Sequence, residues 1–352
     1  MPVLIYMQPI GVNTFFAGGG LIFRALIAAG LIATMAGCGE KPKSPAAGNR
    51  EASWPEEVRE VQIVSSADGS LQKAIFWAPE DRGTPVPLLV NLHTWSGDYR
   101  QEMGIAFFEE ARRRGWAFIH PDFRGPDRRP EAAGSPTATA DILDAVAYAR
   151  GAASVDSGRI YLAGTSGGGH MSLLTAGRSP EIWAGVSAWV PITDLARWHA
   201  ECVARGLDYA RDMEATCGGP PAAGTEVDSQ YRLRSPLSVL GRAAAVAVEI
   251  NTGIHDGHSG SVPVGHSLRG FNELARANGM PEKVIGEQAI ERFETGERVP
   301  PELAGEREDD PAYGDKRVLF RRNAGQARVT VFEGGHEGIP QAACEWLARH
   351  KK

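Results

Sequence analysis

Short apolar runs alternate with amphipathic stretches along the chain from about residue 58 onward. Each run has the length of a strand, and the stretches between them carry apolar residues at helical spacing. Strands are predicted at 61–65, 71–77, 86–93, 116–120, 160–163, 186–190, 246–254 and 329–333, and helices at 103–114, 141–149, 167–177 and 339–350. This alternation is typical of an α/β fold, in which helices cover both faces of a largely parallel sheet.

Two segments interrupt the alternation. Residues 194–240 mix helical patterns with loops that are rich in glycine and proline. Residues 280–316 are dense in acid, with eleven acidic and four basic side chains between residues 281 and 315. Such a segment is either a solvated surface excursion or a rim that repels anionic substrates from a site beneath it.

Residues 159–177 (RIYLAGTSGGGHMSLLTAG) combine a buried strand, a sharp turn and a helix. The turn has the spacing of a nucleophile elbow, G-x-S-x-G, and its strand–turn–helix context is the one this motif requires. Gly164 and Gly168 lie where backbone packs against backbone, which leaves no room for side chains. The turn therefore predicts Ser166 as a nucleophile at its tip; the alternative is a glycine-rich turn with an incidental serine.

A serine hydroxyl needs a general base, and that base needs an acceptor that fixes its tautomer. His336 lies in the loop FEGGHEG, between the last predicted strand and the last helix. This loop falls at the same edge of the sheet as the elbow, and Gly334 and Gly335 let the backbone bend there. We therefore predict His336 as the general base; the alternative is a histidine of a surface loop.

Asp256 is the carboxylate in the loop that follows the strand at 246–254, and it is predicted to be the acid of the triad. His255 and His258 flank it and raise the possibility of a metal site. One short loop without further ligands is a weak basis for such a site, so we expect neither a metal nor another cofactor.

The oxyanion of an acyl-transfer intermediate needs two backbone N–H donors. One is expected from Gly167, directly after the nucleophile. The other is expected from the loop that follows the strand at 86–93, with Trp95 as the first choice and Thr94 as the alternative. The indole of Trp95 either walls the acyl pocket or belongs to the core.

Five stretches of the sequence resemble the catalytic domain of the prolyl oligopeptidase-like branch of the α/β-hydrolases. They are residues 120–125 (HPDFRG), 155–169 (VDSGRIYLAGTSGGG), 231–237 (YRLRSPL), 262–267 (VPVGHS) and 334–338 (GGHEG). The resemblance runs from about residue 86 to the end of the chain. It implies an α/β-hydrolase fold with a lid at 194–240, Ser166 as nucleophile and His336 as base.

The sequence departs from this family in two respects. The family's acid usually lies four residues before the proline of a Val-Pro pair, a position that Ser259 holds here, while the carboxylate is at Asp256. A short tether and a strand pair, rather than a β-propeller, precede the domain. In the family the propeller restricts peptide access, so this sequence favours a hydrolase with an openly accessible active site over a prolyl peptidase.

The N-terminal region is typical of an export signal. Arg24 precedes an apolar run at 25–36, which is short for a membrane span. The run ends in Met-Ala-Gly-Cys, which resembles a bacterial lipobox and predicts lipidation at Cys38. Residues 1–37 are thus a predicted signal peptide, residues 38–57 a flexible tether, and residues 58–352 the catalytic domain. An uncleaved anchor helix and a later start at Met7 are the alternatives.

Export would place the protein in the cell envelope, facing the periplasm or the exterior and held to the membrane by the lipid alone. Disulfides are permissible there, and Cys202 and Cys217 could pair, while Cys344 is expected as a buried thiol. The formal net charge of −6 argues against a nucleic-acid partner.

Three functions from two classes fit these observations. The first is an exported serine hydrolase with a Ser-His-Asp triad, most simply a carboxylesterase that acts on an acylated small molecule or polysaccharide. The second is a serine peptidase that cuts short peptides. The third is a binding module that has kept a hydrolase scaffold without its catalysis. A serine-directed phosphonate separates the third from the first two, because only an activated Ser166 reacts with it.

Overall fold

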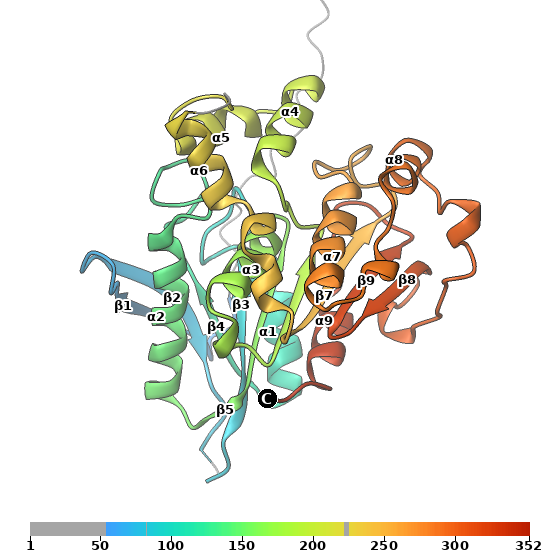
Figure 1. Cartoon of the computed structure of the whole chain (residues 1–352). Helices are drawn as coiled ribbons and strands as arrows, with labels where there is room; N and C mark the ends of the chain where they lie inside the picture. Colours follow the sequence, from blue (N-terminus) through green and yellow to red (C-terminus); the bar gives the residue numbers. More distant parts are fainter. Residues whose placement is uncertain (1–53, 82, 222–224) are drawn as a thin grey trace, which may run out of the picture. The chain divides into compact units, whose positions relative to one another are not determined.

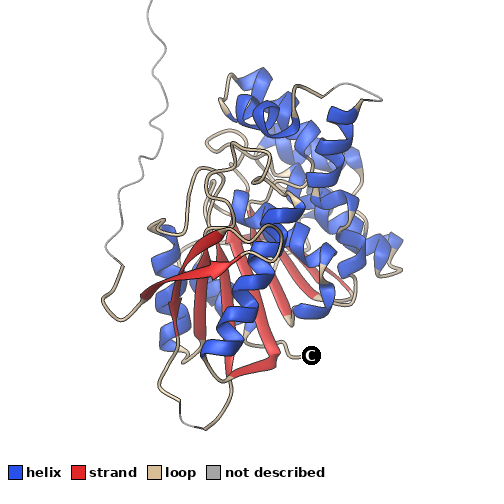
Figure 2. Cartoon of the chain, turned by 90° about the vertical axis from the view of Figure 1, so that its left-hand side faces the viewer, coloured by secondary structure: helices blue, strands red, loops and turns tan. Residues whose placement is uncertain are grey.

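The computed structural model describes residues 54–81, 83–221 and 225–352. These residues form a nine-stranded sheet with helices on both faces (Figures 1 and 2). The predicted signal peptide, the lipidation site at Cys38 and most of the tether lie outside the described residues. No helix in the described part of the chain is long and apolar enough to cross a membrane.

The strands follow the order β1-β2-β4-β3-β5-β6-β7-β9-β8 across the sheet. From β4 to β9 neighbouring strands run parallel, while β1, β2 and β8 are antiparallel at the two edges. The bounds are β1 Arg59–Val64, β2 Leu71–Trp77, β3 Val86–Leu92, β4 Ala117–Pro121, β5 Val155–Thr165, β6 Gly185–Trp189, β7 Ala247–Gly253, β8 Val318–Ala324 and β9 Ala327–Phe332. The predicted α/β-hydrolase fold is confirmed.

The helices form three groups. One face of the sheet is covered by α2, α3 and α7, with α8 packed against α7, and the other face by α1 and α9 (Figure 1). The third group, α4 to α6, lies at the top of Figure 1 and is called the cap below. The bounds are α1 Met103–Arg113, α2 Pro136–Ala152, α3 Gly167–Arg178, α4 Leu195–Arg205, α5 Tyr209–Cys217, α6 Glu226–Arg234, α7 Gly265–Ala277, α8 Glu287–Gly296 and α9 Pro340–Leu347. Short 3-10 helices span Pro180–Ile182, Pro236–Ser238, Leu240–Ala243, Pro281–Lys283, Pro301–Leu303 and Pro311–Tyr313.

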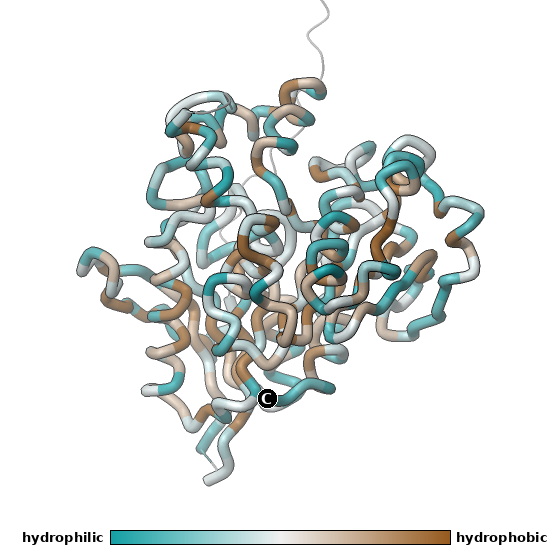
Figure 3. The backbone as a smooth tube through the Cα atoms, viewed as in Figure 1, coloured by the Kyte–Doolittle hydropathy of each residue, from teal (hydrophilic) through white to brown (hydrophobic). Residues whose placement is uncertain are grey.

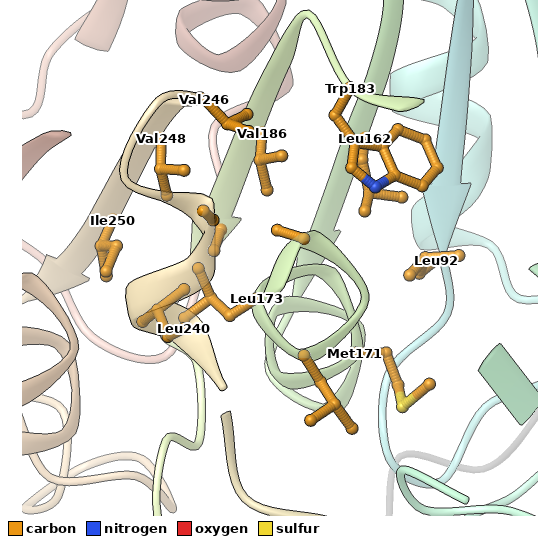
Figure 4. Close-up of a cluster of buried hydrophobic side chains, with 14 of the residues drawn as sticks. Leu92, Leu162, Met171, Leu173, Trp183, Val186, Leu240, Val246, Val248 and Ile250 are labelled. Atoms are coloured by element: carbon orange, nitrogen blue, oxygen red, sulfur yellow. The ribbon is translucent and has the colours of Figure 1, made fainter. Parts of the chain in front are cut away.

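The main core lies between the sheet and the helices α2, α3 and α7. Figure 4 shows Leu162 and Val186 of the central strands facing Leu173 of α3, with Leu240 beside them. Figure 3 shows hydrophobic positions along the strands of the sheet, whereas α8 itself is largely hydrophilic. Burying one such aliphatic side chain stabilises the fold by about 1.5–3 kcal/mol. The central strands read as continuous apolar runs because both of their faces are covered.

Helix α2 begins earlier than its apolar spacing predicts. Its N-cap is Ser135, whose Oγ accepts a hydrogen bond from Ala138 N at 2.9 Å, and Pro136 occupies the first helical position. A serine followed by proline is a strong helix start, because the proline fixes a helical φ and has no N–H to satisfy. Asp141, expected in the first turn, is instead buried in the middle of the helix and paired with Arg124.

The segment 280–316 is not a solvated excursion over its whole length. Ile285, Ile290, Phe293 and Tyr313 are each at most 2 % exposed, and they extend the two cores of the sheet. Three of the acidic side chains, Glu287, Glu291 and Glu294, belong to α8, an amphipathic helix that buries its apolar face, and the others lie outside this helix. Acidic composition alone therefore suggested a surface loop.

The suggested disulfide between Cys202 and Cys217 is not formed. Both side chains are free thiols, buried in one apolar cluster with cap residues, and Cys344 is a free thiol buried in α9. Burial raises the pKa of Cys202 to about 12 and that of Cys217 to about 11. These thiols therefore act as small apolar side chains rather than as a staple.

Candidate active site

Ser166 stands at the sharp turn between β5 and α3. Its backbone has φ 60° and ψ −116°, a conformation that L-residues rarely adopt. A side chain on Gly164 would collide with the backbone of Gly168, and one on Gly168 would collide with Leu92 O, so the turn requires glycine at both positions. Ser166 N donates to Trp189 O at 2.8 Å, which fixes the turn to β6. The first turn of α3 lies directly behind the hydroxyl, with the positive end of its dipole toward it.

The structure brings the three predicted triad residues together. His336 Nε2 lies 2.8 Å from Ser166 Oγ, and His336 Nδ1 lies 2.8 Å from Asp256 Oδ2. They come from loops that follow β5, β7 and β9, which end at the same edge of the sheet. Asp256 is buried and Ser166 is 7 % exposed, whereas the side chain of His336 is 23 % exposed. The histidine is therefore the most open of the three.

Asp256 is held by the backbone of its own loop. Its Oδ1 accepts hydrogen bonds from Gly257 N at 2.9 Å and from Val262 N at 3.2 Å, which leaves Oδ2 for the histidine. Gly260 crosses close above, where a side chain would strike Asp256 Oδ1 and come within 2.5 Å of His336 Cβ. The displaced position of the carboxylate in the sequence is thus compensated by a loop that wraps around it.

Two backbone amides flank the nucleophile. Gly167 is the first residue of α3, so its N–H has no partner within the helix. A side chain on Gly167 would collide with Trp95 N, which shows how closely the two amides approach. Thr94 N already donates to Gln101 Oε1 at 2.9 Å, so of the two alternatives Trp95 is the one whose amide is left for a substrate.

The indole of Trp95 is a wall between the site and the cap. It is 2 % exposed, and its Nε1 donates to Asp212 Oδ2 on α5 at 3.2 Å. Its ring meets Trp198 of α4 edge to face, with centroids 4.9 Å apart. Burial raises the pKa of the Asp212 carboxyl. The indole thus belongs to the buried cluster of the cap and lies beside the predicted oxyanion donors.

His255 and His258, the two histidines beside the acid, contact the segment 280–316. His255 lies between Glu297 and Glu333, with 2.7 and 2.8 Å between ring nitrogens and carboxylate oxygens, and these contacts raise its pKa. His258 Nε2 lies 2.5 Å from Glu294 O. An open cavity of about 570 Å³ beside them is lined by His255, His258, Ser259, Glu297, Lys316, Glu333, Gly334, Gly335 and Glu337. Within the described ranges, no group of three acidic, histidine or cysteine side chains is arranged to hold a metal ion.

Sequence reasoning missed several side chains that support the oxyanion loop. His93 bridges two segments, with its ring nitrogens 2.9 Å from Thr94 O and 2.7 Å from Asp122 O. Asp127 N donates to Trp95 O at 2.8 Å. The HPDFRG stretch is a signal for the turn but not for these contacts, because they join residues some thirty positions apart in the chain. Only the packed structure shows which carbonyl each group meets.

Comparison with known proteins agrees with the fold. Residues 111–285 match the model of the prolyl oligopeptidase family. Similar solved structures include an acylaminoacyl peptidase from Pyrococcus horikoshii (TM-score 0.55, 15% identity, 83% of this chain and 40% of that one). A putative dipeptidyl aminopeptidase IV from Bacteroides ovatus has a TM-score of 0.53 and 15% identity, with 83% of this chain and 34% of that one covered. A puromycin-hydrolyzing peptidase from Mycobacterium tuberculosis has a TM-score of 0.51 and 16% identity, with 82% of this chain and 37% of that one covered. The chain spans about two fifths of the length of these proteins or less. No curated protein matches the chain.

The fold and the elbow turn define the class: the chain is a member of the α/β-hydrolase superfamily. Within that superfamily it has a prolyl oligopeptidase-like catalytic domain, as the match over residues 111–285 shows. The resemblance found in the sequence is thereby confirmed. The described residues hold this domain alone, without a propeller.

Proposed function

We propose that this chain hydrolyses acyl substrates through an acyl-enzyme, with Ser166 as nucleophile, His336 as general base and Asp256 as the acid. The observation that carries the proposal is the continuous pair of 2.8 Å contacts from Ser166 through His336 to Asp256. This is the arrangement that activates a serine, because the histidine takes the hydroxyl proton while the carboxylate stabilises the imidazolium that forms.

The chemistry of each step follows from the positions of these groups. His336 Nε2 accepts the proton of Ser166 as the hydroxyl oxygen attacks the substrate carbonyl. The resulting oxyanion lies between the amides of Gly167 and Trp95, and loss of one such donor typically costs about 2.7–4 kcal/mol of transition-state stabilisation. His336 then gives its proton to the leaving group, and water releases the acyl group by the same steps in reverse.

We propose a carboxylic ester as the bond that is cut. Ser166 is 7 % exposed, and the buried indoles of Trp95 and Trp198 stand beside the oxyanion loop. A site bounded by buried indoles suits a compact acyl group better than an extended peptide, which needs room on both sides of its scissile bond. The leaving group departs past His336, the most open residue of the triad. A bulky alcohol, such as that of a polysaccharide or a larger acylated molecule, can therefore remain in solvent.

A serine peptidase of the prolyl oligopeptidase-like family is the second candidate. The match of residues 111–285 to that family favours it, and several structural neighbours are named as peptidases. The same triad serves both reactions, because His336 can protonate an amine as well as an alcohol. Short peptides are the substrates that would fit beneath the cap.

We also propose that the protein is exported and anchored by a lipid on Cys38, as the sequence before residue 38 suggests. The test is incorporation of an alkyne-labelled fatty acid in the natural host, which Cys38→Ser should abolish. Equal labelling of the variant and the natural chain would contradict the anchor.

The activity is tested with the full chain purified in detergent and two substrate panels. One panel holds short-chain p-nitrophenyl esters and the other holds p-nitroanilides of short peptides, with Ser166→Ala as the blank. We expect turnover of the esters that the blank lacks. Cleavage of anilides at a comparable kcat/KM would favour the peptidase. A fluorophosphonate probe supplies the third arm, because failure to label Ser166 would leave only a binding module.

A further inference from the structure

One face of α4 in the cap carries Trp198, Glu201 and Arg205, spaced three and four residues apart. Side chains at this spacing point to the same side of a helix. Trp198 Nε1 donates to Ser261 O at 3.0 Å, and Arg205 Nη2 donates to Gly260 O at 2.6 Å. A helix of the cap is thus tied to the backbone of the loop that follows Asp256.

The third side chain of this face holds the end of the same loop. Glu201 Oε2 lies 2.9 Å from Nε2 of His266, a fully buried residue at the start of α7. Thr193 N donates to His266 Nδ1, so Nε2 carries the ring proton and donates it to Glu201. This contact fixes the end of the loop at 260–266 between α4 and α7.

This loop is the part of the chain that shapes the acid. Val262 N donates to Asp256 Oδ1, and Gly260 lies against both Asp256 and His336. The loop also brings Ser261 Oγ to 3.5 Å from His336 Nε2, the nitrogen that Ser166 uses. A small displacement of the loop would loosen the carboxylate and offer the histidine a second hydroxyl.

Trp198 links the loop to the opposite wall of the site. Its ring packs edge to face on Trp95, whose amide is one proposed oxyanion donor, and it stacks on Tyr209 of α5 with centroids 5.1 Å apart. Trp198 is 1 % exposed, so its ring has little freedom to move independently of these neighbours. One side chain of the cap thus touches both the oxyanion loop and the acid loop.

We propose that α4 is a positioning element of the triad: Trp198, Glu201 and Arg205 hold the loop at 260–266 so that Asp256 faces His336. The inference rests on the catalytic roles proposed above. None of the three is a catalytic residue, since each acts through the loop. The cap is therefore part of the machinery that sets the acid in place, as well as a cover over the site.

The test compares variants that remove individual ties between α4 and the loop at 260–266. Arg205→Met removes the donors to Gly260 O and, at 3.4 Å, to Ser261 O. Trp198→Phe keeps an aromatic ring while losing the indole donor to Ser261 O. Arg205→Lys is the conservative rescue. Arg211→Met on α5 is the matched control, because Arg211 is 85 % exposed and pairs with Asp208 of its own segment. Melting temperatures confirm that each variant is folded.

Each single loss should lower kcat by about three- to tenfold, the equivalent of one hydrogen bond, with KM unchanged. The double variant Trp198→Phe/Arg205→Met should lower kcat by up to about 100-fold, the cost of a misplaced catalytic group. Arg205→Lys should recover part of the loss, and Arg211→Met should match the natural chain.

A second readout is independent of turnover. The downfield proton resonance of the bond between His336 Nδ1 and Asp256, assigned by its absence in Asp256→Ala, should weaken in Trp198→Phe and in Arg205→Met. Unchanged kcat and an unchanged resonance in the double variant would overturn the inference, as would a loss confined to KM. If the natural chain neither turns over esters nor labels with phosphonate, the proposed function fails, while the resonance still decides whether α4 positions the acid.

Discussion

Ser166 illustrates how much local strain the site carries in a single residue. A non-glycine residue in such a sparsely populated conformation costs about 1–3 kcal/mol. The cost is tolerated because the turn is fixed on both sides, by the close approach of Gly164 to Gly168 and by the bond from Ser166 N to Trp189 O. The strain keeps the hydroxyl at the tip of the turn, where His336 reaches it.

Asp256→Ala tests whether the displaced carboxylate is the acid of the triad. We expect kcat for an ester to fall by about 10⁴-fold, because His336 loses the partner that fixes its tautomer and stabilises its charge. KM should change far less. Ser259→Ala is the control, since Ser259 holds the position where related sequences carry the acid. A near-normal kcat in Asp256→Ala would assign the role to another carboxylate.

Asp127 is a buried acid that supports the oxyanion loop. It is 1 % exposed, its Oδ1 accepts from Ala133 N at 2.6 Å, and its backbone N–H holds Trp95 O. Burial raises the pKa of the Asp127 carboxyl to about 8. At neutral pH the folded protein therefore keeps this group protonated, while in the unfolded chain it ionises near its ordinary value of about 4.

The raised pKa of Asp127 predicts a stability that depends on pH. Between about pH 4 and pH 8 the native state holds a proton that the unfolded state has lost, so the free energy of unfolding falls as the pH rises. Asp127→Asn keeps the acceptor for Ala133 N and removes this dependence. We expect the variant to gain stability relative to the natural chain from pH 5 to pH 8, by on the order of a few kcal/mol. Denaturant unfolding at several pH values measures the free energy of unfolding of both proteins. If this free energy varied with pH in the same way in the variant and the natural chain, Asp127 would not be a buried neutral acid.

At the scale of elements, a buried ion pair joins α2 to the first hairpin and the turn after β4. Arg124 donates to Asp141 Oδ2 at 2.5 Å and to Asp68 Oδ2 at 2.8 Å, and Ser65 Oγ completes the group. The side chains of Arg124 and Asp141 are 9 % and 1 % exposed. The hairpin that opens the sheet is thus fastened to the helix behind it by charge as well as by apolar packing.

Arg124→Met should destabilise the protein by about 3–5 kcal/mol, because it leaves Asp141 as an unpaired buried charge. The double variant Arg124→Met/Asp141→Leu should regain most of that loss, since an apolar pair of similar volume replaces the ion pair. Urea denaturation of both variants measures the difference. A double variant as unstable as the single one would mean that the two side chains do not act as a pair.

The elements differ in how far the sequence could predict them. The run 86–92 was predictable because a strand buried on both faces is apolar almost throughout. Strand β8, at Val318–Ala324, was missed because Arg321 and Arg322 interrupt its apolar pattern. Arg321 is buried against Asp310, and such pairing across distant positions is invisible to a local pattern. Ser166, His336 and Asp256 could be chosen because each follows a strand at one sheet edge, whereas the loop contacts of α4 depend on tertiary packing.

At the scale of the whole molecule, the segment 280–316 is an integral part of the folded domain. Its apolar side chains enter both cores, and Tyr313 OH donates to Asn251 Oδ1 at 2.6 Å in the middle of β7. Its acidic face contacts the site loops through Glu297 and His255. The segment therefore joins the edge of the sheet to the loops that carry Asp256 and His336.

Replacing residues 287–310 with a short Gly-Ser linker tests this conclusion. A solvated excursion could be removed at little cost, because long surface loops add little to the entropy of closure. Here the deletion exposes the apolar surface that Ile290 and Phe293 cover, at about 1.5–3 kcal/mol for each side chain. Since a domain is stable by only about 5–15 kcal/mol, these losses, with the surface newly exposed on α7 and β8, approach the whole margin. We therefore expect an insoluble or molten protein, measured by soluble yield and thermal unfolding; a cooperative transition near that of the full chain would show that the segment is dispensable.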